Sequence, residues 1–173
     1  MKRTLLTTAA LMAFAAPTFA AETYTLDSSH SQIIFSYDHL GFSTTYGMFS
    51  GFAGEIQFDA ENPAASSVSV SMPVMSMFTG WEQRDAHFMS ADFFEASADE
   101  MVSFTSTGIE VTGDNTALIT GDLTLNGVTQ SVVLDAKMNK ADMHPMAQKP
   151  WLGFDATTTL IRSDYGVGNF APF

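Results

Sequence analysis

The sequence predicts an all-β protein, an up-and-down antiparallel barrel with one short helical crossover. Three observations support this fold class. From residue 31 onward, hydrophobic residues recur at every second position, which is the period of a strand with one buried face. The dipeptide Asn126-Gly127 separates two such stretches and is the typical turn of a two-residue hairpin. Short turns between successive alternating stretches are typical of up-and-down barrels.

The alternation predicts seven strands, at residues 31–40, 46–59, 66–77, 101–110, 116–125, 128–139 and 152–162. In the second of them, Phe52, Ile56 and Phe58 alternate with Ala53, Glu55 and Gln57. Gly54 lies on the hydrophobic face of that strand, where a glycine indicates a bend or the close approach of another backbone.

Residues 79–97 lack the period of two, and we predict a short helical crossover there, between the third and fourth strands. Ser90 is expected to cap a second helical turn within it. Residues 140–150 contain Pro145 and Pro150 and predict a loop. No repeat or linker divides residues 21–173, which we expect to form a single barrel domain.

The first 20 residues have the three parts of a secretory signal peptide. Lys2 and Arg3 give a positive start, residues 5–16 form an apolar run, and Thr18-Phe19-Ala20 is a small-x-small cleavage site. The apolar run is too short to span a bilayer as a stable helix. We therefore expect cleavage after Ala20 and a periplasmic location.

The charge and cysteine content exclude several classes of protein. Without Lys2 and Arg3, the chain keeps five basic residues against 19 acidic ones, a formal charge of −14. Such a surface repels nucleic acid and allows only transient contact with an anionic membrane. The absence of cysteine excludes thiolate metal sites and cysteine nucleophiles.

Five stretches resemble, in the same order, the YceI-like family. They cover residues 30–56 (HSQIIFSYDHLGFSTTYGMFSGFAGEI), 84–96 (RDAHFMSADFFEA), 102–110 (VSFTSTGIE), 121–134 (GDLTLNGVTQSVVL) and 153–168 (GFDATTTLIRSDYGVG). The resemblance implies a periplasmic, lipocalin-like barrel of eight strands that binds a polyisoprenoid or another long-chain amphiphile in an apolar pore. It also implies that the protein is not an enzyme and needs no cofactor.

The resemblance further implies one more strand after the segment GVGNFAP, whereas the chain here ends at Phe173. Without that strand, the first and seventh strands would leave two open edges. We expect either that the chain is a truncated product, which is the favoured explanation, or that another chain supplies the missing edge, as in a homodimer.

Alternation places a set of mostly hydrophobic side chains on the inward strand faces. These are Phe35, Tyr37, Phe52, Ile56, Phe58, Val68, Val70, Met72, Phe104, Ile119, Leu123, Val132, Leu134, Phe154, Leu160 and Arg162. Alternation does not separate a filled core from an open channel. The family resemblance favours an open channel in which these residues contact the ligand.

Two arginines are candidates for buried charge. Arg162 falls on the inward face of its strand and requires a partner, for which Asp164 is the nearest candidate. Arg84 has Asp85 beside it. Each arginine is expected to have one of two roles. It either stabilises one end of the barrel or the helix, or it binds a ligand headgroup. Because the chain has few cations, a neutral headgroup such as a quinone or an amide is favoured.

The methionines indicate an alternative function, in which the protein binds copper in the periplasm. Met72, Met75 and Met77 form one cluster, and Met143 and Met146 flank His144 in another. Thioethers bind Cu(I), but methionine also fills irregular gaps in cores, and Met72 lies on an inward face.

The histidines do not predict a metal or catalytic site. His30 and His39 lack the spacing of metal ligands, so we interpret them as hydrogen-bonding scaffold. No GxSxG motif is present, and the carboxylate–imidazole pairs Asp38-His39 and Asp85-His87 have no plausible nucleophile beside them in the sequence.

Overall fold

The computed structural model describes residues 21–168, so the predicted signal peptide lies outside the described residues. The strands, in chain order, are β1 Glu22–Thr25, β2 Ile33–His39, β3 Ser43–Phe49, β4 Ala53–Phe58, β5 Ser67–Pro73, β6 Met101–Gly113, β7 Thr116–Leu125, β8 Val128–Met143 and β9 Pro150–Thr157. The helical elements are α1 Glu82–Met89 and the 3₁₀ turns η1 Pro63–Ala65, η2 Val74–Ser76 and η3 Arg162–Tyr165.

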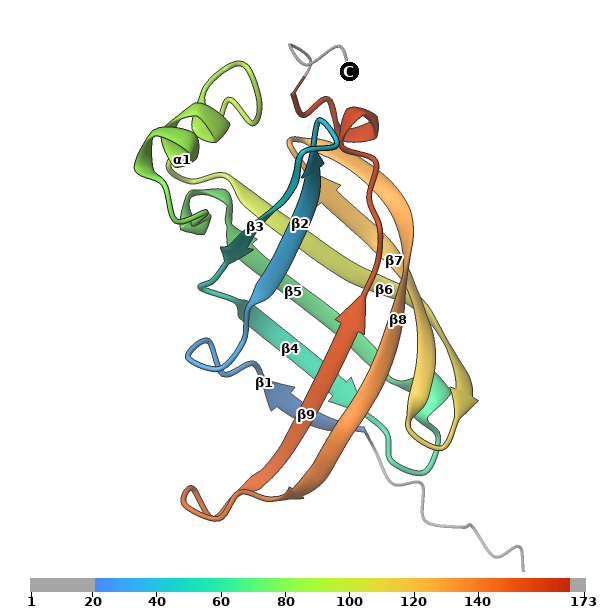
Figure 1. The fold of residues 1–173 in the computed structure, drawn as a ribbon. Coiled ribbons are helices and arrows are strands. Elements are labelled where there is room, and N and C mark those ends of the chain that lie inside the picture. Colours follow the sequence, from blue (N-terminus) through green and yellow to red (C-terminus); the bar gives the residue numbers. More distant parts are fainter. Residues whose placement is uncertain (1–20, 169–173) are drawn as a thin grey trace, which may run out of the picture.

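Seven strands form one curved sheet in the order β1-β4-β5-β6-β7-β8-β9. The strands β2 and β3 form a separate two-stranded hairpin, which Met48 of β3 joins to Phe78 through one isolated antiparallel bridge. Figure 1 shows the sheet wrapping into a nearly closed barrel, with β2 and β9 on either side of the remaining gap. All pairings are antiparallel, and strands β4 to β9 follow one another in sequence, so the predicted fold class is confirmed.

The hairpin between β7 and β8 turns at the predicted dipeptide. Asn126 and Gly127 have φ angles of 52° and 71°, and two consecutive left-handed residues define the turn that matches the twist of the flanking strands. This turn fixes the register in which Leu125 opposes Val128.

Two strand predictions near the N-terminus are wrong. Residues 46–59 form two strands rather than one, because the chain turns at residues 50–52, where Gly51 has a φ angle of +73°. The edge strand β1 was not predicted at all, since four residues of the sequence ETYT give too short an alternation to recognise.

The remaining boundaries differ at the ends of elements. The predicted strand 66–77 stops at Pro73, which has no N–H to continue the ladder, and η2 follows it. The predicted helical crossover contains regular helix only in α1, because Ser90 is extended and its hydroxyl donates to the His87 carbonyl. The strand β8 extends to Met143, so the predicted loop over residues 140–150 shrinks to 144–149, while β9 ends at Thr157.

A cluster of buried hydrophobic residues lies at the end of the barrel that carries α1. Phe49, Met72, Val74, Met77 and Val102 form this cluster, and Val74 is fully buried. Side chains from α1 and the turn after it, including Phe88 and Phe94, pack against it. The helix therefore anchors one end of the barrel through apolar contacts.

Candidate functional site

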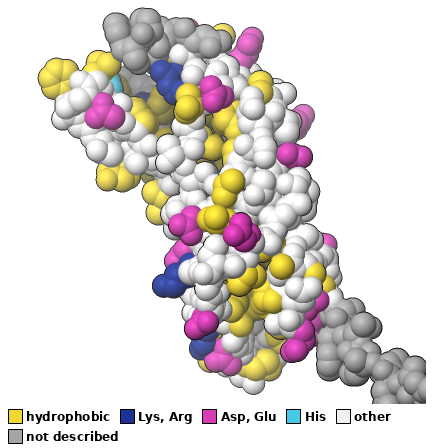
Figure 2. Space-filling view, turned by 90° about the vertical axis from the view of Figure 1, so that its right-hand side faces the viewer, with side chains coloured by type: hydrophobic (Ala, Val, Ile, Leu, Met, Phe, Trp, Pro, Cys, Tyr) yellow, Lys and Arg dark blue, Asp and Glu magenta, His cyan; other side chains and the backbone are white. Residues whose placement is uncertain are grey.

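The interior of the barrel holds a cavity of about 1620 Å³. Its walls come from β2, β3, strands β5 to β9, α1 and the chain that follows β9. The volume exceeds the roughly 300–1,000 Å³ of most small-molecule sites. In Figure 2, hydrophobic side chains are visible in the hollowed upper end of the molecule, while acidic side chains are scattered over its flank.

Most of the predicted inward residues line this cavity. They are Phe35, Tyr37, Phe52, Val70, Met72, Phe104, Leu123, Val132, Leu134, Phe154, Leu160 and Arg162. The structure therefore brings together residues from seven separate segments, as strand alternation requires. Their contact with a ligand stays a prediction.

Four predicted residues lie outside the lining, namely Ile56, Phe58, Val68 and Ile119. Phe58 packs edge-on against Tyr24 and Phe154, with ring centroids 6.5 and 6.3 Å apart. These aromatic contacts join β4 to β1 and β9. The predicted inward residues therefore divide into those that line the cavity and these four that do not.

The sequence analysis missed the part of the wall that comes from α1 and the adjoining turns. Trp81, Arg84, Phe88 and Phe93 all line the cavity. The Phe88 ring lies 5.9 Å from that of Tyr37 across the barrel interior. Positions 81, 84 and 88 share one helical face by their spacing, and this period was the signal that could have found them.

Arg162 does not have the predicted setting. Because β9 ends at Thr157, this residue begins η3 instead of continuing a strand. Its Nη1 group donates to the carbonyls of Val167 and Gly168 at 3.1 and 2.9 Å, and the predicted pair with Asp164 does not form. Arg162 nevertheless lines the cavity, so the position of its charge was predicted and its partner was not.

Arg84 also lacks the predicted direct pair with Asp85. Its Nε donates to Thr79 Oγ1 at 2.8 Å, and its Nη2 donates to the Thr79 carbonyl at 2.6 Å. The Asp85 carboxylate accepts from the backbone N–H and the hydroxyl of the same threonine. The buried Thr79 therefore joins the two charged groups and fixes the start of α1.

His30 belongs to a compact turn before β2. Asp27 Oδ2 lies 2.7 Å from His30 Nδ1, and Ser29 Oγ lies 3.0 Å from the same nitrogen. In a catalytic triad the imidazole uses one nitrogen for the carboxylate and the other for the nucleophile. Both partners here meet at Nδ1, so the three side chains form a scaffold, as predicted.

The carboxyl group of Asp27 provides a test of this turn. Hydrogen bonds from the Ser29 hydroxyl, from His30 and from the Ser29 backbone lower its pKa from 3.8 to about 2. A lowered folded-state pKa means that the carboxylate stabilises the turn fully above pH 4 and loses this effect as the pH falls through 2. An NMR titration of the Asp27 carboxyl is expected to give a midpoint of about 2. Ser29→Ala is expected to raise that midpoint, and a wild-type midpoint at 3.8 would contradict the arrangement.

The two methionine clusters lie at different places in the fold. Met72 and Met77 belong to the buried core, whereas Met75 is 50 % exposed. Met77 reaches the same core as Met72 because η2, which follows Pro73, turns the chain between them. No group of three or more His, Asp or Glu side chains within residues 21–168 is arranged to hold a metal ion.

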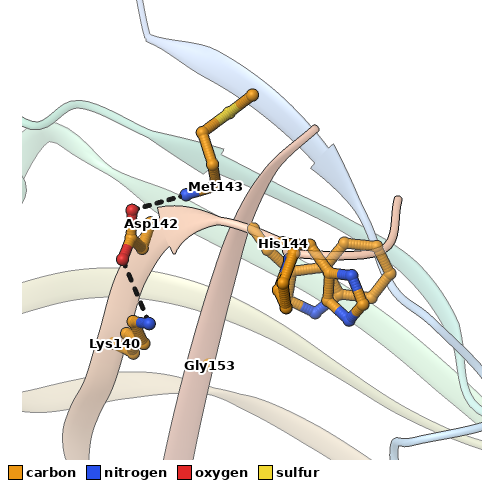
Figure 3. A pocket seen from close by; sticks show the side chains of 7 residues that line it. Lys140, Asp142, Met143, His144 and Gly153 are labelled. Carbon is orange, nitrogen blue, oxygen red and sulfur yellow. Dashed lines mark hydrogen bonds and ion pairs between the residues drawn. The ribbon is translucent and has the colours of Figure 1, made fainter. Parts of the chain in front are cut away.

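The second methionine cluster borders a small surface pocket at the hairpin between β8 and β9. This pocket, of about 130 Å³, is lined by Lys140, Asp142, Met143, His144, Pro145, Trp151 and Gly153. Figure 3 shows the Met143 thioether pointing away from the His144 imidazole. The His144 and Trp151 rings are tilted by 44° to one another, with their centroids 4.7 Å apart. Lys140 and Asp142 form an ion pair at 3.0 Å. The pocket is too small for a long-chain ligand.

The helices of residues 21–168 include none with the length and hydrophobicity needed to cross a membrane.

Comparisons with solved structures agree with this barrel. BcnA from Burkholderia cenocepacia has a TM-score of 0.70 at 22% identity, covering 80% of this chain and 82% of that one, which shows the fold alone. A YCEI protein from Campylobacter jejuni has a TM-score of 0.68 at 29% identity and covers 86% of each chain.

Sequence comparisons give the family. A UPF0312 protein from Ectopseudomonas mendocina is 42% identical over 153 residues, which is 85% of this chain and 78% of the relative. Protein YceI from an Escherichia coli strain is 40% identical over 171 residues, or 96% of this chain and 88% of the relative. A model of the YceI-like domain matches residues 24–172. The chain therefore belongs to the YceI-like family.

Proposed function

We propose that this protein is an exported carrier that holds a polyisoprenoid or another long-chain amphiphile inside its barrel. The observation that carries the proposal is the cavity of about 1620 Å³ with its largely apolar and aromatic lining. Apolar area removed from water contributes roughly 25 cal/mol per Å² to binding, less the cost of ordering a flexible tail. A long tail supplies enough area to outweigh that cost.

Sequestration without catalysis fits the polar groups of the described chain. The Ser29, His30 and Asp27 side chains lack the geometry of a proton relay, and their turn lies on the surface. His87 Nε2 lies 2.9 Å from an Asp92 carboxylate oxygen, and both side chains are about half exposed at the surface. The predicted signal peptide supports export and a periplasmic location.

Two neighbouring valines on β8 allow a matched test of the cavity. Val132 lines it, while Val133 is 48 % exposed on the opposite face of the same strand. Protein purified from a periplasmic extract is expected to carry a long-chain adduct in native mass spectrometry. Val132→Trp, which places an indole inside the barrel, is expected to lower the occupancy at least tenfold, while Val133→Trp keeps it.

The proposed function fails if the wild-type protein carries no long-chain adduct and takes up none from a lipid extract. It also fails if both tryptophan variants retain the adduct to the same degree, since the ligand would then lie elsewhere. Near-ultraviolet circular dichroism of both variants checks that the barrel remains folded.

A further inference from the structure

The turn between β2 and β3 presents two large hydrophobic side chains to solvent. Leu40 is 59 % exposed and Phe42 is 88 % exposed. Trp81, just before α1, and Ile161, just before η3, are also more than half exposed. In Figure 1 this turn, α1 and η3 all lie at the upper end of the barrel. Four exposed hydrophobic side chains therefore share one end of the molecule.

The backbone of this turn is held in one conformation by two hydrogen bonds. Asp38 Oδ1 accepts from the Gly41 N–H at 2.6 Å, and the Phe42 N–H donates to the His39 carbonyl at 3.0 Å. Because the turn is already closed, a partner that contacts its side chains does not bear the cost of ordering the loop.

Leu40 has an unfavourable backbone conformation. Its φ angle is +57°, in the left-handed region that Gly, Asn and Asp adopt more readily than a bulky residue does. The leucine side chain is mostly exposed, so burial within the protein offsets little of this strain. A strained residue without such compensation favours a role for its side chain outside the fold.

The exposed end of the barrel is also the mouth of the cavity. Leu40 and Trp81 both line the cavity although more than half of each residue is open to solvent. The cavity therefore opens between them. A carrier exchanges its long-chain cargo with a membrane, and a mouth that touches the bilayer shortens the path of an apolar tail through water.

The charge pattern of the turn suits a neutral lipid surface. Residues 39–54 contain no Asp, Glu, Lys or Arg, although the mature chain as a whole is strongly acidic. Phenylalanine, leucine and tryptophan side chains favour the boundary between headgroups and acyl chains. The acidic remainder of the surface is repelled by anionic lipids, so the combination fits a zwitterionic bilayer.

The hairpin at the opposite end of the barrel differs in both respects. In the turn between β8 and β9, Met146 is 85 % exposed, but the charged side chains of Lys140 and Asp142 lie beside this turn. Residues 143–151 do not belong to the cavity lining. This hairpin therefore provides a matched control for the turn between β2 and β3.

We propose that the end of the barrel formed by Leu40, Phe42, Trp81 and Ile161 docks on a zwitterionic phospholipid bilayer, with the cavity mouth facing the membrane. The proposed carrier function supplies the reason for this contact, on which the inference rests. Docking itself requires no cargo, so the two are measured separately.

The test uses vesicles of phosphatidylcholine, to which the mature protein is added before co-sedimentation. Reversible binding that changes little with salt is expected. Phe42→Ala and Leu40→Asn are each expected to weaken it roughly tenfold, since each removes hydrocarbon from the contact. Asparagine tolerates a positive φ angle, so Leu40→Asn adds no strain. Met146→Ala is expected to leave the binding unchanged.

A second set of vesicles tests the class of lipid. With an equimolar mixture of phosphatidylcholine and anionic phosphatidylglycerol, binding is expected to be weaker and to recover as salt is added. Tighter binding to the anionic vesicles would overturn the assignment to a zwitterionic surface.

Three further results would overturn the docking. These are no binding of the wild type to phosphatidylcholine vesicles, an equal loss of binding in Met146→Ala and Phe42→Ala, and a dimer that Phe42→Ala dissociates in analytical ultracentrifugation while vesicle binding is unchanged. The last would assign the exposed end to a second copy of the chain. A protein with a long-chain adduct that binds no vesicles keeps the carrier function and loses the docking. One that binds vesicles but carries no adduct and takes none up keeps the docking and loses the carrier function.

Discussion

Replacement of Gly54 by alanine is expected to lower the free energy of unfolding by about 3 kcal/mol. Gly54 lies on β4 opposite Val70 of β5 and has a φ angle of +138°, which side chains rarely tolerate. A Cβ at this position would lie 2.2 Å from the Ser69 carbonyl oxygen and 2.7 Å from the Val70 Cα. Both neighbours are backbone atoms of the sheet, so the contact is relieved only if the strands separate.

The matched control is Gly108→Ala on β6. A Cβ at Gly108 would meet no atom within 4 Å, so this substitution is expected to change the stability by less than about 0.5 kcal/mol. Urea denaturation followed by circular dichroism measures both variants. Equal midpoints for the two would show that β4 and β5 are not in close contact at Gly54.

Phe104→Ala is expected to cost about 3 kcal/mol of stability, near the lower limit for a buried phenylalanine. The side chain is 6 % exposed, and its ring covers Gly121, where a Cβ would lie 2.4 Å from the ring. Phe104 also lines the cavity, so removal of its ring would enlarge the cavity. The same variant is therefore expected to hold a bulkier tail.

Phe42→Ala provides the same chemical change at a position that is 88 % exposed, in the turn between β2 and β3. We expect its stability to stay within about 0.5 kcal/mol of the wild type. Chemical denaturation compares the two variants under identical conditions. A Phe104→Ala protein as stable as Phe42→Ala would mean that the β6 side of the interior is not packed.

Strand alternation predicted the fold class and much of the cavity wall because both depend on a strict period of two. It gave the correct face for Phe35, Val70 and Leu123, which lie within regular strands. It did not predict the division of residues 46–59 into two strands or the hydrogen-bond partners of Arg162, because the turn at Gly51 and the end of β9 interrupt the period before these positions. A local turn shifts every later side chain to another face, and alternation carries no signal for it.

The presence of Arg84 and Arg162 in the wall of one cavity could not be predicted from the charge content. The sequence shows how many cations the chain has. Whether two of them reach the same cavity depends on how α1 and η3 are placed, and these elements are 73 residues apart at their closest ends. Both arginines donate hydrogen bonds to backbone carbonyls. Every residue has such a carbonyl, so the sequence does not indicate which ones accept these bonds. The tertiary structure was needed to bring Arg84 and Arg162 to the same wall.

The gap between the β2–β3 hairpin and β9 bears on how cargo is loaded. A closed tube admits a flexible chain only end first, so that loading slows as the chain lengthens. Here no backbone hydrogen bond joins β2 to residues 150–160, and both segments line the cavity. A long tail would enter sideways through this gap along its whole length, while Met48 and Phe49 hold the base of the hairpin against Phe78 and the buried cluster. The rate of exchange of the proposed cargo would then not depend on its length.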